Sequence, residues 1–191
     1  MGNFIGTNPP VGKNTEADVT AYVAVATAEV DPGTVQWYKD SSNRVSVLRY
    51  YQAAATIAAG AALVKSTSSR NPYNLAQSAT SDAGYDLCKG IAAAAVSNTS
   101  YYSWAFIAEY CPAAAINSGF ASNQPMRLSG TTAAKFGSIP NINATVWSTY
   151  TAMTTVTEQH AVIWTLGSES SATSATDVFT TVSCIINGWL G

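Results

Sequence analysis

The chain has 191 residues, of which 47% are hydrophobic and only 10% are charged, with nine Lys and Arg against eleven Asp and Glu. An ordinary soluble domain carries about 25% charged residues. The few basic residues exclude an electrostatic footprint for nucleic acid. The apolar fraction excludes a disordered chain, and no run of about 18 apolar residues is present that would span a membrane.

Small residues dominate the composition, with 32 Ala, 21 Ser and 22 Thr. A monomer usually relies on surface charge to stay apart from its copies. So neutral a surface favours a protein that works inside an assembly. The alternative is an ordinary β domain whose Ser- and Thr-rich faces meet water.

The first 16 residues are rich in Gly, Pro, Asn and Thr and predict an extended N-terminal arm without a core of its own. Phe4 and Ile5 are adjacent apolar side chains in these polar surroundings. We expect either a frayed terminus or an arm that docks on a neighbouring molecule through these two side chains. The segment lacks the basic start and apolar run of a secretion signal.

A period-two pattern of Val, Ala, Thr and Tyr predicts a strand over Ala17–Val30. Asp31-Pro32-Gly33 then predicts a turn, because Pro fixes φ and Gly accepts a positive φ. The next residues predict a hairpin, with strands at Val35–Tyr38 and Arg44–Tyr51 joined by a turn at Asp40–Asn43.

Two short strands are predicted within Ala61–Ser66 and Leu87–Ala95, and a clear one over Tyr101–Tyr110, which Pro112 is expected to end. On this last strand Tyr102, Trp104, Phe106 and Tyr110 share one side. Such an aromatic stripe is typical of the buried side of a sheet. The alternative is an exposed platform on which sugars stack.

The C-terminal third predicts further strands and a Ser- and Thr-rich connection over Gly167–Thr176. Trp189 and Leu190 close the chain after the last strand, which we expect to pack back or onto a partner. The predicted organisation is an arm at 1–16, a β-rich domain at 17–167, and a flexible linker with a C-terminal strand at 168–191. These further strands are Pro125–Ser129, Ala144–Tyr150, His160–Leu166 and Val178–Asn187.

A weak internal echo links Ala53–Gly60 to Ala113–Gly119, since in both an Ala run leads to Ile and then Gly. It predicts either two similar corners of one barrel or a chance match in a low-complexity sequence. The echo is too short to establish a repeat architecture.

No catalytic set is recognisable. His160 is the only histidine, so a nucleophile has no partnered base, and we interpret it as a strand residue beside Glu158. Asp82 and Asp86 are two acids without the denser ligand pattern of a calcium site. Cys88, Cys111 and Cys184 lack metal-ligand spacing and are expected to be reduced and buried. We therefore predict no enzyme, no metal and no cofactor.

A series of short features follows in order from Tyr50 to Gly137. They are Ala54–Lys65, Asn71-Pro72-Tyr73, Ala79-Thr80, Cys88–Ala93, Tyr102–Ile107, Tyr110–Ala113, Ser118-Gly119 and Leu128. Their order resembles that of the small β-rich decoration or cement proteins on the heads of tailed bacteriophages. The resemblance implies a non-enzymatic protein, often trimeric, that clamps neighbouring major capsid proteins against internal pressure.

The sequence thus predicts an all-β fold, a compact β-barrel or β-sandwich with an N-terminal arm and a C-terminal strand. The predicted function is a structural virion protein, made in the host cytoplasm, that binds the outside of a phage capsid. Its expected partners are the major capsid protein and itself, as a homotrimer, without nucleic acid or membrane. The predicted contacts are Phe4, Ile5, Trp189 and Leu190. The alternatives are a tail or fibre component, or a carbohydrate-binding β-sandwich that uses Trp104, Tyr102 or Tyr110.

Overall fold

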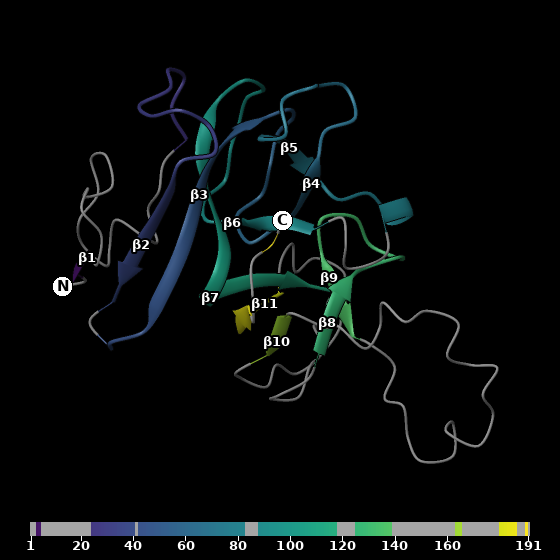
Figure 1. Ribbon diagram of the computed structural model, residues 1–191. Helices are drawn as coiled ribbons and strands as arrows, with labels where there is room; N and C mark the ends of the chain where they lie inside the picture. The colour runs from purple at the N-terminus through teal and green to yellow at the C-terminus, as the bar shows by residue number, and fades with distance from the viewer. Residues whose placement is uncertain are drawn as a thin grey trace, which may run out of the picture.

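A computed structural model describes residues 3–4, 24–40, 42–82, 88–117, 125–138, 163–165, 180–186 and 190. The predicted all-β class is confirmed: the described residues form strands and one short 3-10 turn, with no α-helix among them (Figure 1). The elements are β1 (Asn3–Phe4), β2 (Val35–Lys39), β3 (Val45–Ala53), β4 (Ala62–Lys65), β5 (Asn74–Gln77), η1 (Thr80–Asp82), β6 (Cys88–Ala92), β7 (Tyr102–Ile116), β8 (Pro125–Leu128), β9 (Phe136–Ser138), β10 (Ile163–Thr165) and β11 (Thr180–Ile186).

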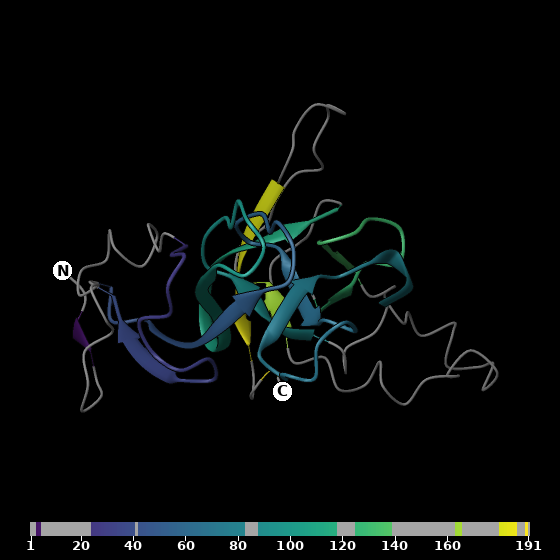
Figure 2. The same ribbon diagram turned by 90° about the horizontal axis from the view of Figure 1, so that it is seen from above.

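The predicted hairpin is confirmed as β2 and β3, which pair antiparallel from Val35↔Arg49 to Lys39↔Val45. The turn before it is also confirmed, because the Thr34 N–H donates to the Asp31 carbonyl at 3.0 Å and Gly33 has φ 101°. Turn chemistry and period-two alternation are local signals, so the sequence alone specifies this unit. Seen from above, the hairpin extends to one side of the body (Figure 2).

The strands β3, β5, β4, β6 and β7 form a closed ring, because each pairs with the next and β7 pairs back with β3. The β3–β5 contact is parallel and the other four are antiparallel. Closure leaves the ring without a free edge, which is how small barrels solve the problem of unpaired strand groups.

A second closed ring of five strands follows the same path: β7, β9, β8, β10 and β11, with β11 pairing back to β7. Again the first contact, β7–β9, is parallel and the rest are antiparallel. The topology of the first ring is therefore repeated, with β7 serving as the last strand of one ring and the first strand of the other.

The two rings also agree in register. Leu63↔Gln77 in the first corresponds to Met126↔Ser138 in the second, shifts of 63 and 61 positions along the chain. The same shifts relate Lys65↔Leu75 to Leu128↔Phe136. Because a register slip of one residue turns every side chain to the other face, this agreement means that the same positions point inward in both rings.

The turns after β4 and β8 are equivalent as well. Ser66 N–H donates to Asn74 O at 2.9 Å, and Ser129 N–H donates to Lys135 O at 2.9 Å. Two residues further on, the N–H of Ser68 donates to Ser66 Oγ and that of Thr131 donates to Ser129 Oγ, at 3.3 and 3.2 Å. Each hydroxyl thus holds its own turn, as Ser does in ST-turns.

The ring interiors correspond at five positions. A cluster to which all five strands of the first ring contribute includes Tyr51, Ala53, Leu63, Leu75 and Ala105. The equivalent positions of the second ring, by the shifts in pairing, are likewise at most 1% exposed. They are Ala114, Ile116, Met126, Phe136 and Cys184.

The strand β7 differs from the sequence prediction, because it continues for six residues beyond Tyr110. The expectation that Pro112 ends the strand is wrong. Pro112 lies where β7 has two residues opposite one of β11, between the pairs Cys184↔Cys111 and Val182↔Ala114. A proline without an N–H is tolerated at such a bulge. Figure 1 shows β7 changing direction near its middle, where Glu109 has φ 62°.

Two further expectations need correction. In the described part of Ala17–Val30, the only sheet contact is an isolated bridge from Val25 to Tyr102, so residues 24–30 do not form the predicted strand. The sequence similarity between Ala53–Gly60 and Ala113–Gly119 aligns Ala53 with Ala113. The strand pairing instead makes Ala53 equivalent to Ile116, three positions later. The duplication lies in topology rather than in that sequence match.

The remaining predicted strands are confirmed where they are described, as β4, β6, β8, β10 and β11. The C-terminal strand β11 packs back on β7 of the same chain. The predicted strand at Ala144–Tyr150 and the connection at Gly167–Thr176 lie outside the described residues.

Candidate partner-binding surface

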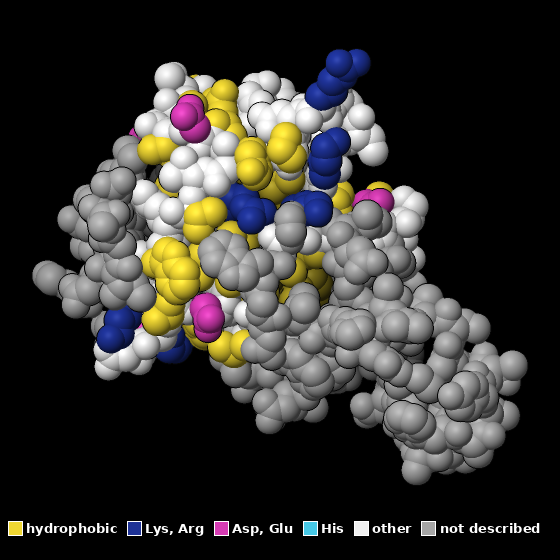
Figure 3. Space-filling view, viewed as in Figure 1, with side chains coloured by type: hydrophobic (Ala, Val, Ile, Leu, Met, Phe, Trp, Pro, Cys, Tyr) yellow, Lys and Arg dark blue, Asp and Glu magenta, His cyan; other side chains and the backbone are white. Residues whose placement is uncertain are grey.

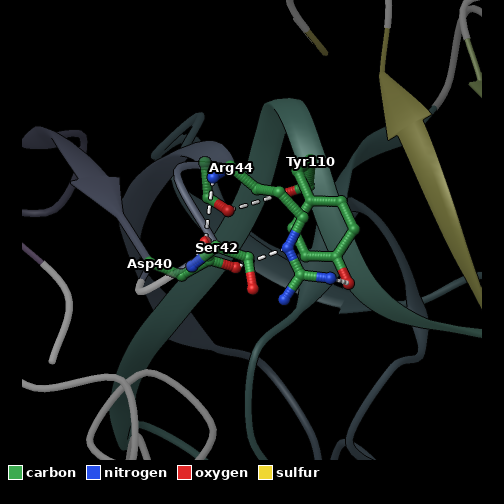
Figure 4. A network of polar contacts seen from close by, with 5 residues as sticks. Asp40, Ser42, Arg44 and Tyr110 are labelled. Atoms are coloured by element: carbon green, nitrogen blue, oxygen red, sulfur yellow. Dashed lines mark hydrogen bonds and ion pairs between the residues drawn. The ribbon is translucent and has the colours of Figure 1, made fainter.

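The tip of the β2–β3 hairpin is fixed by a polar cluster around Asp40 (Figure 4). One carboxylate oxygen accepts from the N–H groups of Ser42 and Arg44 at 2.9 and 2.8 Å, and the other pairs with Arg44 Nε at 2.6 Å. Asn43 between them has φ 63°, a conformation that Asn tolerates in turns. The carboxylate therefore replaces the backbone acceptors that the tight turn lacks.

The same cluster ties the hairpin to the bend of β7. Arg44 Nη1 donates to the hydroxyl of Tyr110 at 2.9 Å, and its guanidinium carbon lies 4.2 Å from the centre of the Tyr110 ring. Ser46 Oγ donates to the Tyr110 carbonyl at 2.7 Å. The hairpin is thus held rigidly against the strand that both rings share.

The electrostatics of the cluster favour a charged Asp40. Burial alone would raise the pKa of this carboxyl group, but hydrogen bonds from the backbone and side chain of Arg44, its positive charge and the Ser42 N–H outweigh burial. The net result is a pKa of Asp40 below its ordinary value. The ion pair with Arg44 therefore persists over the neutral and mildly acidic range.

The outer face of β2 carries an apolar side chain on the surface. Along β2 the buried Gln36 and Tyr38 alternate with Trp37, which is 41% exposed. Among the large apolar side chains of the described residues, Trp37 alone is exposed to this degree. A tryptophan on a rigid strand is a typical anchor of protein interfaces.

The predicted contact residues fall in different places. Phe4 belongs to β1, whose backbone pairs antiparallel with β2 through Phe4↔Tyr38, so β1 lies beside the strand that carries Trp37. Ile5 and Trp189 lie outside the described residues.

Leu190, expected at a partner contact, is buried in the core of its own chain and is 2% exposed. Its N–H donates to the Ile107 carbonyl at 2.9 Å, and its carbonyl accepts from Arg49 Nη1 at 3.1 Å. The side chain thus serves to close the body of the protein rather than to face outward.

The aromatic stripe of β7 is confirmed as a buried face for Trp104 and Phe106, which are 4% and 2% exposed. Trp104 packs against Tyr50 with ring centres 5.0 Å apart, and Tyr102 stacks on the same ring at 5.9 Å. The ring of Tyr110 is covered by Arg44. The alternative in which Trp104 forms an exposed sugar platform is therefore wrong, since a stacking platform needs a free ring face.

No metal centre or membrane-spanning helix is found in the described part of the chain. There, no group of three or more His, Cys, Asp and Glu side chains could hold a metal ion. The described residues contain no helix long and apolar enough to cross a membrane. Asp82 caps its own turn by accepting from the Ala79 N–H at 2.6 Å, and Asp86 and His160 lie outside the described residues.

Comparison with protein-family models and with curated proteins finds no match to this chain.

Sequence reasoning missed Trp37 and the Asp40 cluster. The period-two pattern identified the β2 strand but not which side of it faces solvent, because both sides carry aromatic residues. The cluster joins Arg44 to Tyr110, 66 positions apart, and no local pattern records such a contact. The one available signal was Asp40 itself, an acid at the start of a predicted turn.

Proposed function

We propose that this chain is a structural virion protein that binds the outside of a phage capsid and stabilises the contacts between major capsid proteins. It acts as a homotrimer and contributes no catalysis. The observation that carries the proposal is the pairing of the N-terminal strand β1 with β2, next to the exposed Trp37. The strand β1 and an anchoring side chain of β2 thereby lie on neighbouring strands.

The two joined rings support a role as a rigid link between capsid proteins. Two closed rings share β7, and backbone hydrogen bonds also join them directly, from Ala62 N–H to Ala134 O at 2.9 Å and from Ala115 N–H to Gly60 O at 2.8 Å. A body cross-linked in this way resists deformation, so it transmits load between the capsid proteins that it touches.

The surface suits a repeated contact within a shell. On the face in Figure 3, charged side chains are few and lie among neutral and apolar ones. Small neutral side chains allow close approach without the cost of burying unpaired charge. Each square ångström of apolar surface buried contributes about 25 cal/mol, so modest contacts repeated around a symmetric trimer add up.

Co-sedimentation tests the proposal. Expanded capsids assembled from the major capsid protein of the same phage are incubated with the full chain and pelleted. We expect saturable retention of the chain, with at least about tenfold weaker binding for Trp37→Ser, since anchor residues contribute about 2 kcal/mol or more. Thr99→Ala, a change at an exposed loop residue away from β2, is the matched control and should bind as the unaltered chain does.

The absence of retention on capsids would overturn the proposal. Retention on purified tails instead would identify the protein as a tail or fibre component. Equal binding of Trp37→Ser and the unaltered chain would leave capsid binding standing but remove β2 from the interface.

A further inference from the structure

Three cysteines from distant parts of the sequence meet in one hydrophobic cluster. Cys88 of β6, Cys111 of β7 and Cys184 of β11 are free thiols, all buried at 4% exposure or less. As predicted from the sequence, all three are buried. Their arrangement, however, is not that of three unrelated core residues.

Cys111 and Cys184 face one another across the pair of strands that closes the second ring. They are direct partners in the antiparallel register of β7 and β11. Opposed residues of such a pair have Cα atoms about 4.5 to 5.5 Å apart and side chains on the same face. That separation lies within the range of about 4.4 to 6.8 Å that a disulfide spans.

Cys88 is engaged elsewhere. Its register partner is Val64 of β4, and its Sγ donates to the carbonyl of Gly90 at 3.6 Å. It belongs to the first ring, whereas Cys111 and Cys184 both belong to the second ring. The register therefore selects one pair out of the three possible ones.

We propose that Cys111 and Cys184 are a disulfide site that covalently locks β11 onto β7 when the chain meets an oxidising low-molecular-weight disulfide. The thiolate of one cysteine attacks oxidised glutathione and releases one glutathione thiolate. The second cysteine then attacks the protein sulfur of the mixed disulfide and releases the other. The two thiol protons pass to the released glutathiones, so one protein disulfide and two reduced glutathiones result.

The thiols react slowly while the protein stays closed. Burial raises the pKa of Cys88 to about 12, and the hydrogen bond with Cys111 together with burial raises the pKa of Cys184 well above its ordinary value. Because the thiolate is the attacking species, the disulfide forms during folding or when β11 opens locally. The inference does not rest on the proposed function, since it concerns the stability of the body alone.

Peptide mapping tests the proposal on the full chain. The protein is incubated with a mixture of reduced and oxidised glutathione in urea just below its unfolding midpoint, then returned to buffer, alkylated and digested. We expect one free thiol per chain, at Cys88, and one linked peptide joining Cys111 to Cys184. Reducing this product should raise the population of unfolded chain by at least about tenfold, because the cross-link spans a long loop.

Two variants sharpen the test. Cys88→Ala should form the same linked peptide, and Cys184→Ala should form none; should Cys184→Ala fail to fold, the map of the unaltered chain decides by itself. Three free thiols after the incubation would overturn the proposal. So would a linked pair that includes Cys88, or a Cys111–Cys184 link whose reduction leaves stability unchanged.

Discussion

Replacing Gly90 by Ala tests the closure of the first ring. Gly90 lies buried on β6, where a Cβ atom would be 2.9 Å from the Cβ of Ala105 and 3.2 Å from the carbonyl oxygen of Phe106. Both neighbours belong to β7, which cannot retreat because its opposite edge pairs with β3 and its C-terminal half pairs with β11. The added methyl group must therefore strain the ring.

The expected loss follows from two costs and one opposing effect. Overpacking of a tight core costs about 1 to 3 kcal/mol, the φ of 157° at Gly90 adds strain once a Cβ is present, and the lower entropy of Ala in the unfolded chain offsets about 0.5 to 1 kcal/mol. A net loss of about 1 to 2 kcal/mol corresponds, at a urea dependence of about 2 kcal/mol per molar, to a fall in the unfolding midpoint of about 0.5 to 1 M.

The matched control is Gly137→Ala on β9 of the second ring. A Cβ at Gly137 would meet its nearest neighbour, Asn117 Oδ1, at 3.4 Å, an ordinary contact. We expect its midpoint to stay the same or rise slightly. If Gly90→Ala unfolds at the midpoint of the unaltered chain, or if both variants lose the same stability, the close approach of β6 to β7 is not as described.

Three further predictions concern Asp40 at the hairpin tip, the buried Leu190, and the turns after β4 and β8. Because the pKa of Asp40 is lower in the folded than in the unfolded chain, its contribution to stability is present at neutral pH and is lost as pH falls below about 4. Urea midpoints of Asp40→Asn and the unaltered chain should therefore differ at pH 7, and the difference should shrink as the pH falls below about 4; a constant gap would contradict this. Leu190→Ala should lower the free energy of unfolding in urea by about 2 to 5 kcal/mol, and Leu190→Met by less than about 1.5 kcal/mol. An Ala variant as stable as the unaltered chain would show that Leu190 is not packed. Ser129→Ala should lower the free energy of unfolding more than Ser66→Ala does in the same assay. Ser129 Oγ accepts from Asn117 Nδ2 and from the N–H groups of Thr131 and Thr132, whereas among the described residues Ser66 Oγ bonds only with Ser68. Equal losses of stability would refute this explanation of the two turns.

The sequence predicted those parts of the fold that local signals specify. The turn at Asp31–Gly33 and the β2–β3 hairpin follow from turn residues and period-two alternation, and they are found where expected. The buried aromatic face of β7 was predicted for the same reason. These elements need no information from elsewhere in the chain.

The ring closures could not be predicted, because each depends on only one or two residue pairs between segments that are distant in the sequence. The parallel contact of β3 with β5 involves two residue pairs, and that of β7 with β9 involves one. Pro112 misled the prediction for a related reason: its missing N–H matters only if a partner strand needs it, and β7 itself bulges at that point.

The residues predicted to contact a partner lie in different parts of the structure. Phe4 was chosen as an apolar residue in a polar arm, and its strand does lie beside β2. Leu190 was chosen as an apolar residue that closes the chain after the last strand, but it packs in the core of its own chain. Apolar character alone does not distinguish a side chain that binds a partner from one that completes a core.

Electron cryomicroscopy of the assembled virion is the most direct test of the proposed role. We expect density for this chain on the outer surface of the capsid, arranged as trimers over contacts between major capsid proteins, with β2 and Trp37 facing the shell. Density confined to the tail, or a capsid surface without any density for this chain, would contradict it.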